Sequence, residues 1–335
     1  MFDDLPPWRS ESLPVPGGHR LHLAQHGRRD GIPALLLHGG PGSGQSPLLR
    51  RFFDPARWRL ICVDQRGAGA SLPAGEIRDN TSADLLADLR RIRSHLGLAR
   101  WLVVGGSWGA TLALAHAADA PEAVAGLLLR STFLARPQDI AAFFDRGHAS
   151  TPAAHAAWDS LTRAAGCRAG VPAAQLLPAI AAVLAAAGAS AAQDELACAW
   201  WGWEQALASE GPPGPMPPAA ALRQRYRVQS HYLQHGCWLP GDGALALADR
   251  LPAVPTLLLH GLADRICPAA GARALHAALP HSRWQALPGV GHEPGHPAMV
   301  QAMVQALERY AERRDFEATL DRPAATSGPD RCRCA

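Results

Sequence analysis

The segment Gly105-Gly106-Ser107-Trp108-Gly109 constrains the fold of this chain more than any other part of the sequence. An apolar run, Trp101–Val104, precedes it and is typical of a buried strand, while the residues that follow Gly109 favour a helix. A serine between glycines on such a sharp strand-to-helix turn carries its hydroxyl above the sheet, beside the positive end of the helix dipole. Only small residues fit two positions before and after it. The segment therefore predicts that Ser107 is a nucleophile.

Short apolar runs elsewhere in the chain predict a parallel sheet. The runs are Ala34–Leu37, Leu60–Val63, Trp101–Val104, Val124–Leu129, Thr256–His260 and Trp284–Leu287. Runs of this kind are typical of strands that are buried on both faces. Helical segments such as Ser82–Leu96 and Pro297–Ala311 lie between or after them. This alternation predicts an α/β fold with a mostly parallel central sheet and helices on both faces.

Residues 133–240 interrupt the alternation of strands and helices. They are rich in Ala, Trp, Pro and His, so we expect short helices there, with an irregular loop at Gly211–Pro218. We interpret 133–240 as a helical cap inserted between a first part of the core, 1–132, and a second part, 241–313. Residues 314–335 lack apolar periodicity and predict a mobile C-terminal tail. The spacing of Cys332 and Cys334 in that tail is too short for a zinc site without a second pair.

Composition favours a soluble cytoplasmic protein. The 335 residues are 48% hydrophobic and carry a formal charge of only +3, so the chain can bury a core and nucleic acid is not an expected partner. Seven scattered cysteines are typical of a reducing compartment. The N-terminus lacks the features of a signal peptide. The alanine-rich stretch Ala179–Ala192 is shorter than the roughly 20 residues that cross a bilayer, so we expect no membrane partner.

Two further residues complete a candidate catalytic triad. A serine becomes a good nucleophile when a base takes its proton and a carboxylate orients that base. Asp264 follows the strand predicted at Thr256–His260, and His292 follows the one predicted at Trp284–Leu287. Both therefore fall at the same sheet edge as Ser107, in the chain order Ser, Asp, His that accompanies this kind of turn. A single aspartate or histidine in a loop is more often a turn residue, but the three together favour a triad.

Acyl transfer by a serine also requires at least two N–H donors for the oxyanion. We assign the backbone amides of Trp108, directly after the nucleophile, and of Gly40, in the loop His38-Gly39-Gly40-Pro41-Gly42. These glycines also suit a simple turn, and the two roles are compatible. A phosphate-binding loop is excluded because no Lys-Ser/Thr pair follows at the required spacing.

The segment His292-Glu293-Pro294-Gly295-His296 matches the H-E-x-x-H pattern of zinc peptidases. That motif requires a helix, which places both imidazoles on one face. Proline and glycine at the two middle positions make a continuous helix unfavourable. We therefore predict neither a metal nor another cofactor, and we expect His296 to be a surface residue or one that supports the site indirectly.

Four motifs together resemble the prolyl iminopeptidases (proline aminopeptidases), serine peptidases of the α/β-hydrolase superfamily. They are His38–Gly42, Asp64-Gln65-Arg66-Gly67, Gly105–Gly109 and Asp264-Arg265-Ile266-Cys267-Pro268, and the resemblance extends to about Ala311. It implies the α/β-hydrolase fold with an inserted helical cap. It also implies release of N-terminal proline, or a similar small residue, from small peptides with a free amino terminus, through an acyl-enzyme and without a metal.

The resemblance also assigns a substrate pocket. Trp200-Trp201-Gly202-Trp203-Glu204 is similar to the family's Trp-x-x-Trp-Glu element, whose glutamate binds the substrate's amino terminus. Glu204 is thus expected to bind the ammonium group, with Trp203 as an apolar wall. Arg130 and Phe133 line up with pocket residues of the family, and Phe143 with a nearby aromatic position. Alternatively, the tryptophans are the core of the cap and Glu204 is a solvated helix residue.

The sequence departs from the family at Gln229, in Arg227-Val228-Gln229-Ser230-His231-Tyr232, where a second glutamate is usual. Loss of one carboxylate is expected to weaken amine binding by about 1–3 kcal/mol. A capped esterase or amidase of the same fold, without strict proline selectivity, therefore stays an alternative. A second alternative is a ligand-binding relative that does not catalyse. Dehalogenase and epoxide hydrolase chemistry are disfavoured because those relatives carry aspartate at the position of Ser107.

Overall fold

The computed structural model describes residues 1–335 except 169, 209–213 and 318–335. The described residues form a sheet of eight strands: β1 (Arg9–Pro14), β2 (Arg20–Gly27), β3 (Ile32–Leu37), β4 (Trp58–Val63), β5 (Trp101–Gly106), β6 (Val124–Arg130), β7 (Thr256–Gly261) and β8 (Ser282–Leu287). The strand order is β1-β2-β4-β3-β5-β6-β7-β8. β1, β2 and β4 pair antiparallel, whereas every pair from β4 to β8 is parallel. The predicted mostly parallel sheet is confirmed.

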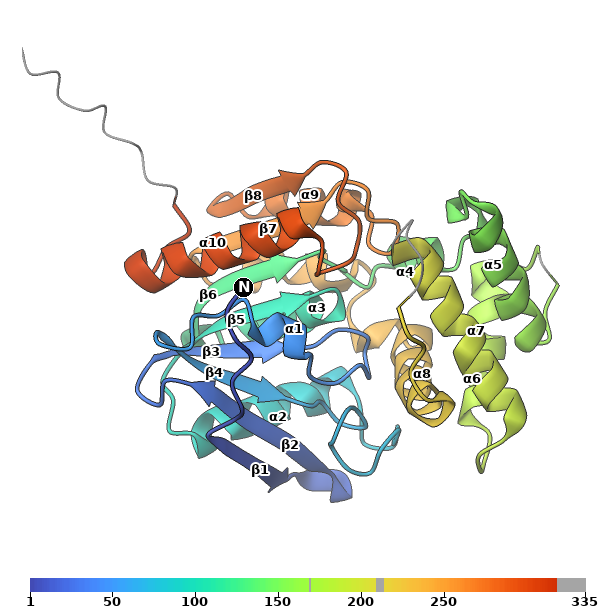
Figure 1. The fold of residues 1–335 in the computed structure, drawn as a ribbon, viewed down its shortest axis with the longest axis horizontal. Coiled ribbons are helices and arrows are strands. Elements are labelled where there is room, and N and C mark those ends of the chain that lie inside the picture. The colour runs from blue at the N-terminus through green and yellow to red at the C-terminus, as the bar shows by residue number, and fades with distance from the viewer. Residues whose placement is uncertain (169, 209–213, 318–335) are drawn as a thin grey trace, which may run out of the picture.

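Helices cover both faces of the sheet (Figure 1). The core helices are α1 (Pro47–Arg50), α2 (Ser82–His95), α3 (Trp108–Asp119), α9 (Ala269–Ala278) and α10 (Pro297–Arg313). Because side chains of a strand alternate between faces, Leu35 and Leu37 pack with residues of α2, α3 and α9, whereas Leu36 packs with α10. The expected α/β-hydrolase architecture therefore places two apolar layers around the sheet.

The six strands predicted from apolar runs correspond to β3–β8, each slightly longer than its run. β1 and β2 were not predicted. β1 is largely exposed at the sheet edge, and β2 mixes polar with apolar side chains, so neither forms a continuous apolar run. α2 ends one residue before the predicted Leu96, and α10 continues to Arg313, beyond the predicted Ala311.

Five helices lie together beside the sheet, at the right of Figure 1. They are α4 (Pro137–Phe143), α5 (Pro152–Ala164), α6 (Ala173–Ala185), α7 (Ala191–Ala208) and α8 (Ala219–Gln234). The expectation of short helices holds for α4 but is wrong for α7, with 18 residues, and α8, with 16. α7 is long because Leu196, Trp200, Trp203 and Leu207, spaced three or four residues apart, bury one stripe inside the cap.

The remaining helical turns are single 3-10 segments around this framework. They are Pro16–Gly18, Pro121–Ala123, Arg146–His148, Gly236–Trp238 and Gly243–Arg250. The predicted irregular loop at Gly211–Pro218 is without regular structure over 214–218, and its first part lies outside the described residues. In the part of the chain that the structure describes, no helix is both long and apolar enough to span a bilayer.

The end of α10 is followed by residues that pack on the core. Phe316 is buried, and its ring lies 5.0 Å from that of Tyr310. Arg283 pairs with Asp315 at 3.5 Å. The expectation that a mobile tail begins at residue 314 is therefore wrong for 314–317, because an aromatic side chain anchors this segment. The rest of the expected tail, with Cys332 and Cys334, lies outside the described residues.

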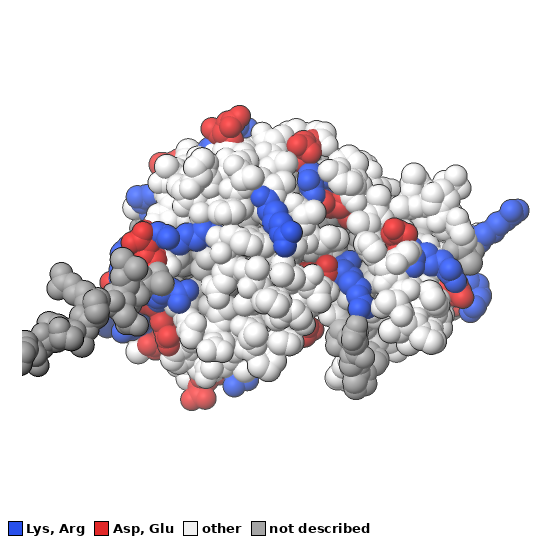
Figure 2. Space-filling model, turned by 90° about the horizontal axis from the view of Figure 1, so that it is seen from above, with Lys and Arg blue, Asp and Glu red and all other residues white. Residues whose placement is uncertain are grey.

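Charged side chains are scattered over the face of the molecule shown in Figure 2. The chain has no lysine, so each blue residue there is an arginine. Arginines and acidic residues are intermixed on this face, in keeping with the formal charge of +3.

Candidate active site

Ser107 stands at the turn between β5 and α3 with φ 56° and ψ −126°. A positive φ is unfavourable for any residue with a Cβ, so the surroundings must impose it. The Ser107 amide donates to the Arg130 carbonyl at 3.0 Å. A Cβ at Gly105 would lie 2.2 Å from the Gly109 carbonyl oxygen, and one at Gly109 would lie 2.3 Å from that of Leu37. Glycine is thus required on both sides of the serine for the turn to close.

Asp264 and His292 meet at the carboxyl ends of β7 and β8. His292 Nδ1 lies 2.8 Å from Asp264 Oδ2, and Asp264 Oδ1 accepts from the amides of Ile266 and Cys267 at 3.0 and 2.8 Å. Burial alone would raise the pKa of Asp264, but His292 and these hydrogen bonds outweigh burial and hold that pKa below its usual value. An ionised Asp264 requires a proton on Nδ1, which leaves Nε2 of His292 free to act as a base.

Ser107 and His292 line the same cavity, which has a volume of about 380 Å³. The Ser107 hydroxyl has a sulfur neighbour, since its Oγ lies 3.8 Å from Cys267 Sγ. Burial raises the pKa of the Cys267 thiol well above its usual value, so this neighbour is neutral. The serine–histidine hydrogen bond of such sites is commonly long in a free enzyme and shortens when substrate binds. The structure therefore brings the three predicted residues to one place, with the aspartate–histidine pair already formed.

Of the two predicted oxyanion donors, one lines this cavity and the other directly follows Ser107, which lines it. Gly40, with φ 108°, lines it. Trp108 is the first residue of α3, so its amide has no acceptor within the helix. Gln65 joins the two segments, since its Nε2 donates to the His38 carbonyl at 3.1 Å and its Oε1 accepts from Trp108 Nε1 at 2.8 Å. Gln65 was part of a recognised motif, but the sequence alone gave it no role.

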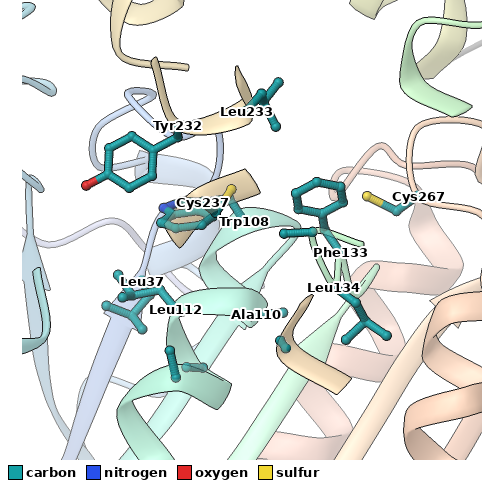
Figure 3. Packing of buried hydrophobic residues seen from close by; sticks show 14 of the residues in the cluster. Leu37, Trp108, Ala110, Leu112, Phe133, Leu134, Tyr232, Leu233, Cys237 and Cys267 are labelled. Atoms are coloured by element: carbon teal, nitrogen blue, oxygen red, sulfur yellow. The ribbon is translucent and has the colours of Figure 1, made fainter. Parts of the chain in front are cut away.

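The cap covers the nucleophile turn directly. In Figure 3 the ring of Tyr232, from α8, lies above Trp108, and Phe133 and Cys267, which both line the cavity, lie to the right of Trp108. The rings of Trp108 and Tyr232 are 5.0 Å apart in an edge-to-face arrangement. Phe133 and Phe143 both line the cavity, as expected for apolar walls.

Trp203 does not line the cavity, so its prediction as a wall of the pocket is wrong. It is fully buried inside the cap, where its ring lies 5.1 Å from that of Trp158 and its Nε1 donates to the Phe143 carbonyl at 2.9 Å. Neighbouring residues of a helix point about 100° apart, so Trp203 faces the cap interior when Glu204 faces the cavity. Trp203 supports Phe143 from behind instead.

Glu204 is buried and lines the cavity, which rules out the alternative of a solvated helix residue. Three side chains of α8 donate to its carboxylate. Gln229 Nε2 lies 2.8 Å from Oε1, and Tyr226 Oη and Arg225 Nη2 lie 2.8 and 2.7 Å from Oε2. Arg225 and Tyr226 were not predicted as site residues. A signal existed, because Arg225 is four residues before Gln229 and thus on the same helical face.

Arg130 lies at the end of β6 and lines the cavity. Its Nη1 donates to the His292 carbonyl at 2.8 Å and to Ser131 Oγ at 3.1 Å. Burial lowers the pKa of the guanidinium. Arg130 therefore lines the cavity, where a role in substrate binding was expected. It also holds the loop that carries His292.

The segment His292–His296 is not helical, and α10 begins only at Pro297. His296 caps that helix, accepting from the Ala298 amide at 3.3 Å. No group of three or more His, Cys, Asp or Glu among the described residues has the arrangement of a metal site.

The family model of the alpha/beta hydrolase fold matches residues 33–297. A proline iminopeptidase of Neisseria meningitidis is 36% identical over 314 residues, covering 92% of this chain and 98% of that protein. A probable proline iminopeptidase of Leptolyngbya boryana is 34% identical over 327 residues, covering 94% and 98%.

Two solved structures share the fold. VinJ superimposes with a TM-score of 0.61 at 21% identity, covering 92% of this chain and 99% of that one. Proline iminopeptidase of Mycobacterium smegmatis superimposes with a TM-score of 0.59 at 19% identity, covering 92% and 100%.

Proposed function

This chain belongs to the α/β-hydrolase family and, within it, to the proline iminopeptidases, and we propose that Ser107, His292 and Asp264 carry out its exopeptidase reaction. The observation that supports this most is the preformed Asp264–His292 pair, whose histidine lines the same cavity as the strained Ser107 and the buried Glu204. One cavity thus contains a candidate nucleophile, a base and a carboxylate for an amine.

The proposed reaction begins when Ser107 Oγ attacks the carbonyl carbon of the N-terminal residue. His292 Nε2 takes the hydroxyl proton, while Asp264 keeps the imidazole oriented and stabilises its charge. The amides of Gly40 and Trp108 stabilise the oxyanion. His292 then protonates the leaving amine, so the peptide bond breaks and an acyl-enzyme remains. A water molecule repeats these steps and releases the free amino acid.

We propose that the cap, residues 133–240, determines which substrate enters. Glu204 and Gln229 would receive the substrate's amine, and Phe133 and Phe143 would contact an apolar ring such as that of proline. Arg130 would serve the pocket through its contact with the His292 loop. Small peptides with a free amino terminus would enter this cavity, which has a volume of about 380 Å³. Neither nucleic acid nor a membrane is a proposed partner.

We also propose that the protein works in the cytoplasm. The described cysteines, Cys62, Cys167, Cys198, Cys237 and Cys267, are all free. Free cysteines, three of them buried, suit a reducing compartment.

Replacement of Ser107 tests the mechanism. Ser107→Ala should lower kcat for proline p-nitroanilide by roughly 10⁴- to 10⁶-fold and abolish covalent labelling by an organophosphonate. Ser10 offers a matched control, because Ser10 Oγ, His22 and Asp64 form another hydrogen-bonded series, with both contacts at 2.9 Å, outside this cavity. Ser10→Ala should keep rate and labelling. A Ser107→Ala enzyme that still turns over near the wild-type rate would refute the assignment.

A second comparison separates the exopeptidase from a capped esterase or amidase. Proline p-nitroanilide and its N-acetyl derivative differ at the amine, which only an exopeptidase must recognise. The wild-type enzyme should cleave the free-amine substrate faster, and Glu204→Gln should remove part of this preference. Equal rates on both substrates in the wild type would favour the esterase or amidase.

A further inference from the structure

The carboxylate expected to bind the substrate's amine already has a cationic partner in this protein. Arg225 Nη2, on α8, lies 2.7 Å from Glu204 Oε2, on α7. The Glu204 side chain is 8% exposed and that of Arg225 28%, and both line the cavity. Burial alone would lower the pKa of Arg225, but the charge of Glu204 outweighs burial and raises that pKa above its usual value. Arg225 is therefore a fixed cation at the amine site.

Few acceptor positions are left for a substrate. A carboxylate offers about four lone-pair sites, and Arg225, Tyr226 and Gln229 occupy three of those on Glu204. Gln229 Oε1 is buried and has no hydrogen-bond partner among the described residues. An incoming ammonium thus meets one remaining site on Glu204 Oε1 and the neutral amide oxygen of Gln229.

Together, the three side chains Glu204, Arg225 and Gln229 carry a net charge close to zero. Glu204 and Arg225 cancel, and Gln229 contributes no charge. A buried carboxylate without a cation gains strongly from a substrate ammonium, because the ammonium supplies the missing counter-charge. With Arg225 in place, Glu204 already has a counter-charge before substrate arrives, so the ammonium gains much less. The ammonium must then bind beside the positively charged Arg225 or displace it from Glu204.

We propose that Arg225 competes with the substrate's ammonium group for Glu204 and so makes the requirement for a free amino terminus loose. The proposal rests on the proposed function, because it concerns the same cavity. It assigns Arg225 as a specificity-determining residue. The substrate class widens accordingly to acyl groups whose α-position carries a neutral hydrogen-bonding substituent as well as to those with an amine.

Two substrates of equal shape measure this competition. One is proline p-nitroanilide, and the other is the p-nitroanilide of tetrahydrofuran-2-carboxylic acid, in which an ether oxygen replaces the charged ring nitrogen. Arg225→Met removes the charge but keeps an unbranched stem beside the Tyr226 ring, over which the guanidinium now lies at 5.0 Å. It should lower KM for the proline substrate about tenfold, the effect of one charged hydrogen bond, with little change for the ether.

The controls separate competition from general damage. Arg225→Lys keeps the cation and should restore the wild-type ratio of the two KM values. Arg223→Met removes an arginine of the same helix that pairs with Asp194 and does not line this cavity, so it should change neither KM. Arg225→Gln provides a second neutral variant if the methionine variant does not fold. In a Glu204→Gln background the gain from Arg225→Met should vanish.

The outcome is decided by the ratio of the two KM values. A ratio unchanged within about twofold, or a higher KM for the proline substrate in Arg225→Met, would overturn the proposal, since Arg225 would then be neutral or helpful to amine binding. If no variant cleaves the proline anilide, the proposed function fails separately. The competition is then read from inhibition of ester hydrolysis by prolinamide, whose inhibition constant Arg225→Met must lower about tenfold.

Discussion

Ser107 adopts a backbone conformation that costs of order 1–3 kcal/mol for a residue with a Cβ. Gly105 and Gly109 allow the chain to turn there, and the Ser107 amide donates a hydrogen bond to the Arg130 carbonyl. The energy of this strain is offset by burial of β5 and α3, whose apolar residues belong to one core. At the scale of single residues, the site is therefore a half-buried hydroxyl on a turn that the core forces into place.

Gln65 connects the two segments that carry the proposed oxyanion donors, through the His38 carbonyl and the Trp108 indole. Gln65→Met keeps the size of the side chain but leaves the His38 carbonyl and Trp108 Nε1 without partners. We expect kcat for proline p-nitroanilide to fall roughly 10- to 100-fold with little change in KM, because loss of positioning affects the transition state more than substrate binding.

A double-mutant cycle checks this role for Gln65. Trp108→Phe removes only the indole N–H, so it breaks one of the two contacts. In the double variant, the loss of kcat should be smaller than the sum of the two single losses, since both changes remove the same hydrogen bond. Fully additive effects, or a change confined to thermal stability, would show that Gln65 is only structural.

The triad positions could be predicted because each follows an apolar run, and strand ends meet at one sheet edge. Arg225 could not, because its ion pair with Glu204 depends on how α7 packs against α8. Trp203 was assigned the wrong surroundings for the same reason: the sequence indicates a helix but not which face meets the cavity. Chemistry at strand ends was therefore predictable, and chemistry between cap helices was not.

At the scale of elements, α3 and β5 share a polar contact inside the apolar core. Trp101 Nε1, at the start of β5, donates to His116 Nε2, near the end of α3, at 3.1 Å. Both side chains are buried, and burial lowers the pKa of His116 from 6.5 to about 4. The imidazole is therefore neutral at neutral pH, and protonating it is unfavourable in the folded chain.

His116 makes stability depend on pH in a defined direction. Its pKa is about 4 in the folded chain and 6.5 when unfolded, so the unfolded state binds the proton first as pH falls. The stabilisation is complete above 6.5 and is lost progressively down to about pH 4. Between about pH 7.5 and about pH 5, this residue alone should remove roughly 2 kcal/mol of unfolding free energy.

The variant that isolates this effect is His116→Gln, which keeps an acceptor for Trp101 but cannot be protonated. Urea unfolding at about pH 7.5 and at about pH 5 measures the loss of stability between them. This loss should be smaller in the variant than in the wild type by roughly 2 kcal/mol. Other buried histidines titrate in both proteins and cancel in the comparison. Identical pH dependence in the two proteins would contradict the assignment.

At the scale of the whole molecule, a buried polar network joins the cap to the core. Tyr232 Oη, on α8, donates to Asn80 Oδ1 at 2.8 Å, and Asn80 Nδ2 donates to the Arg66 carbonyl at 3.1 Å. Arg66 forms two hydrogen bonds with Asp88 of α2, at 2.6 and 2.8 Å. Each of these side chains is buried, so a continuous hydrogen-bonded series runs from the cap to α2 inside the molecule.

Arg66 and Asp88 are 2% and 3% exposed, so removal of Arg66 leaves the Asp88 carboxylate buried without its guanidinium partner. Arg66→Met should lower the unfolding free energy by about 3–5 kcal/mol, the cost of an unpaired buried charge. The double variant Arg66→Met/Asp88→Leu removes both charges and should recover much of that loss. Chemical denaturation of the two variants and the wild type measures the difference. A double variant no more stable than Arg66→Met would mean that Arg66 stabilises through its contacts near Asn80, and not by neutralising Asp88.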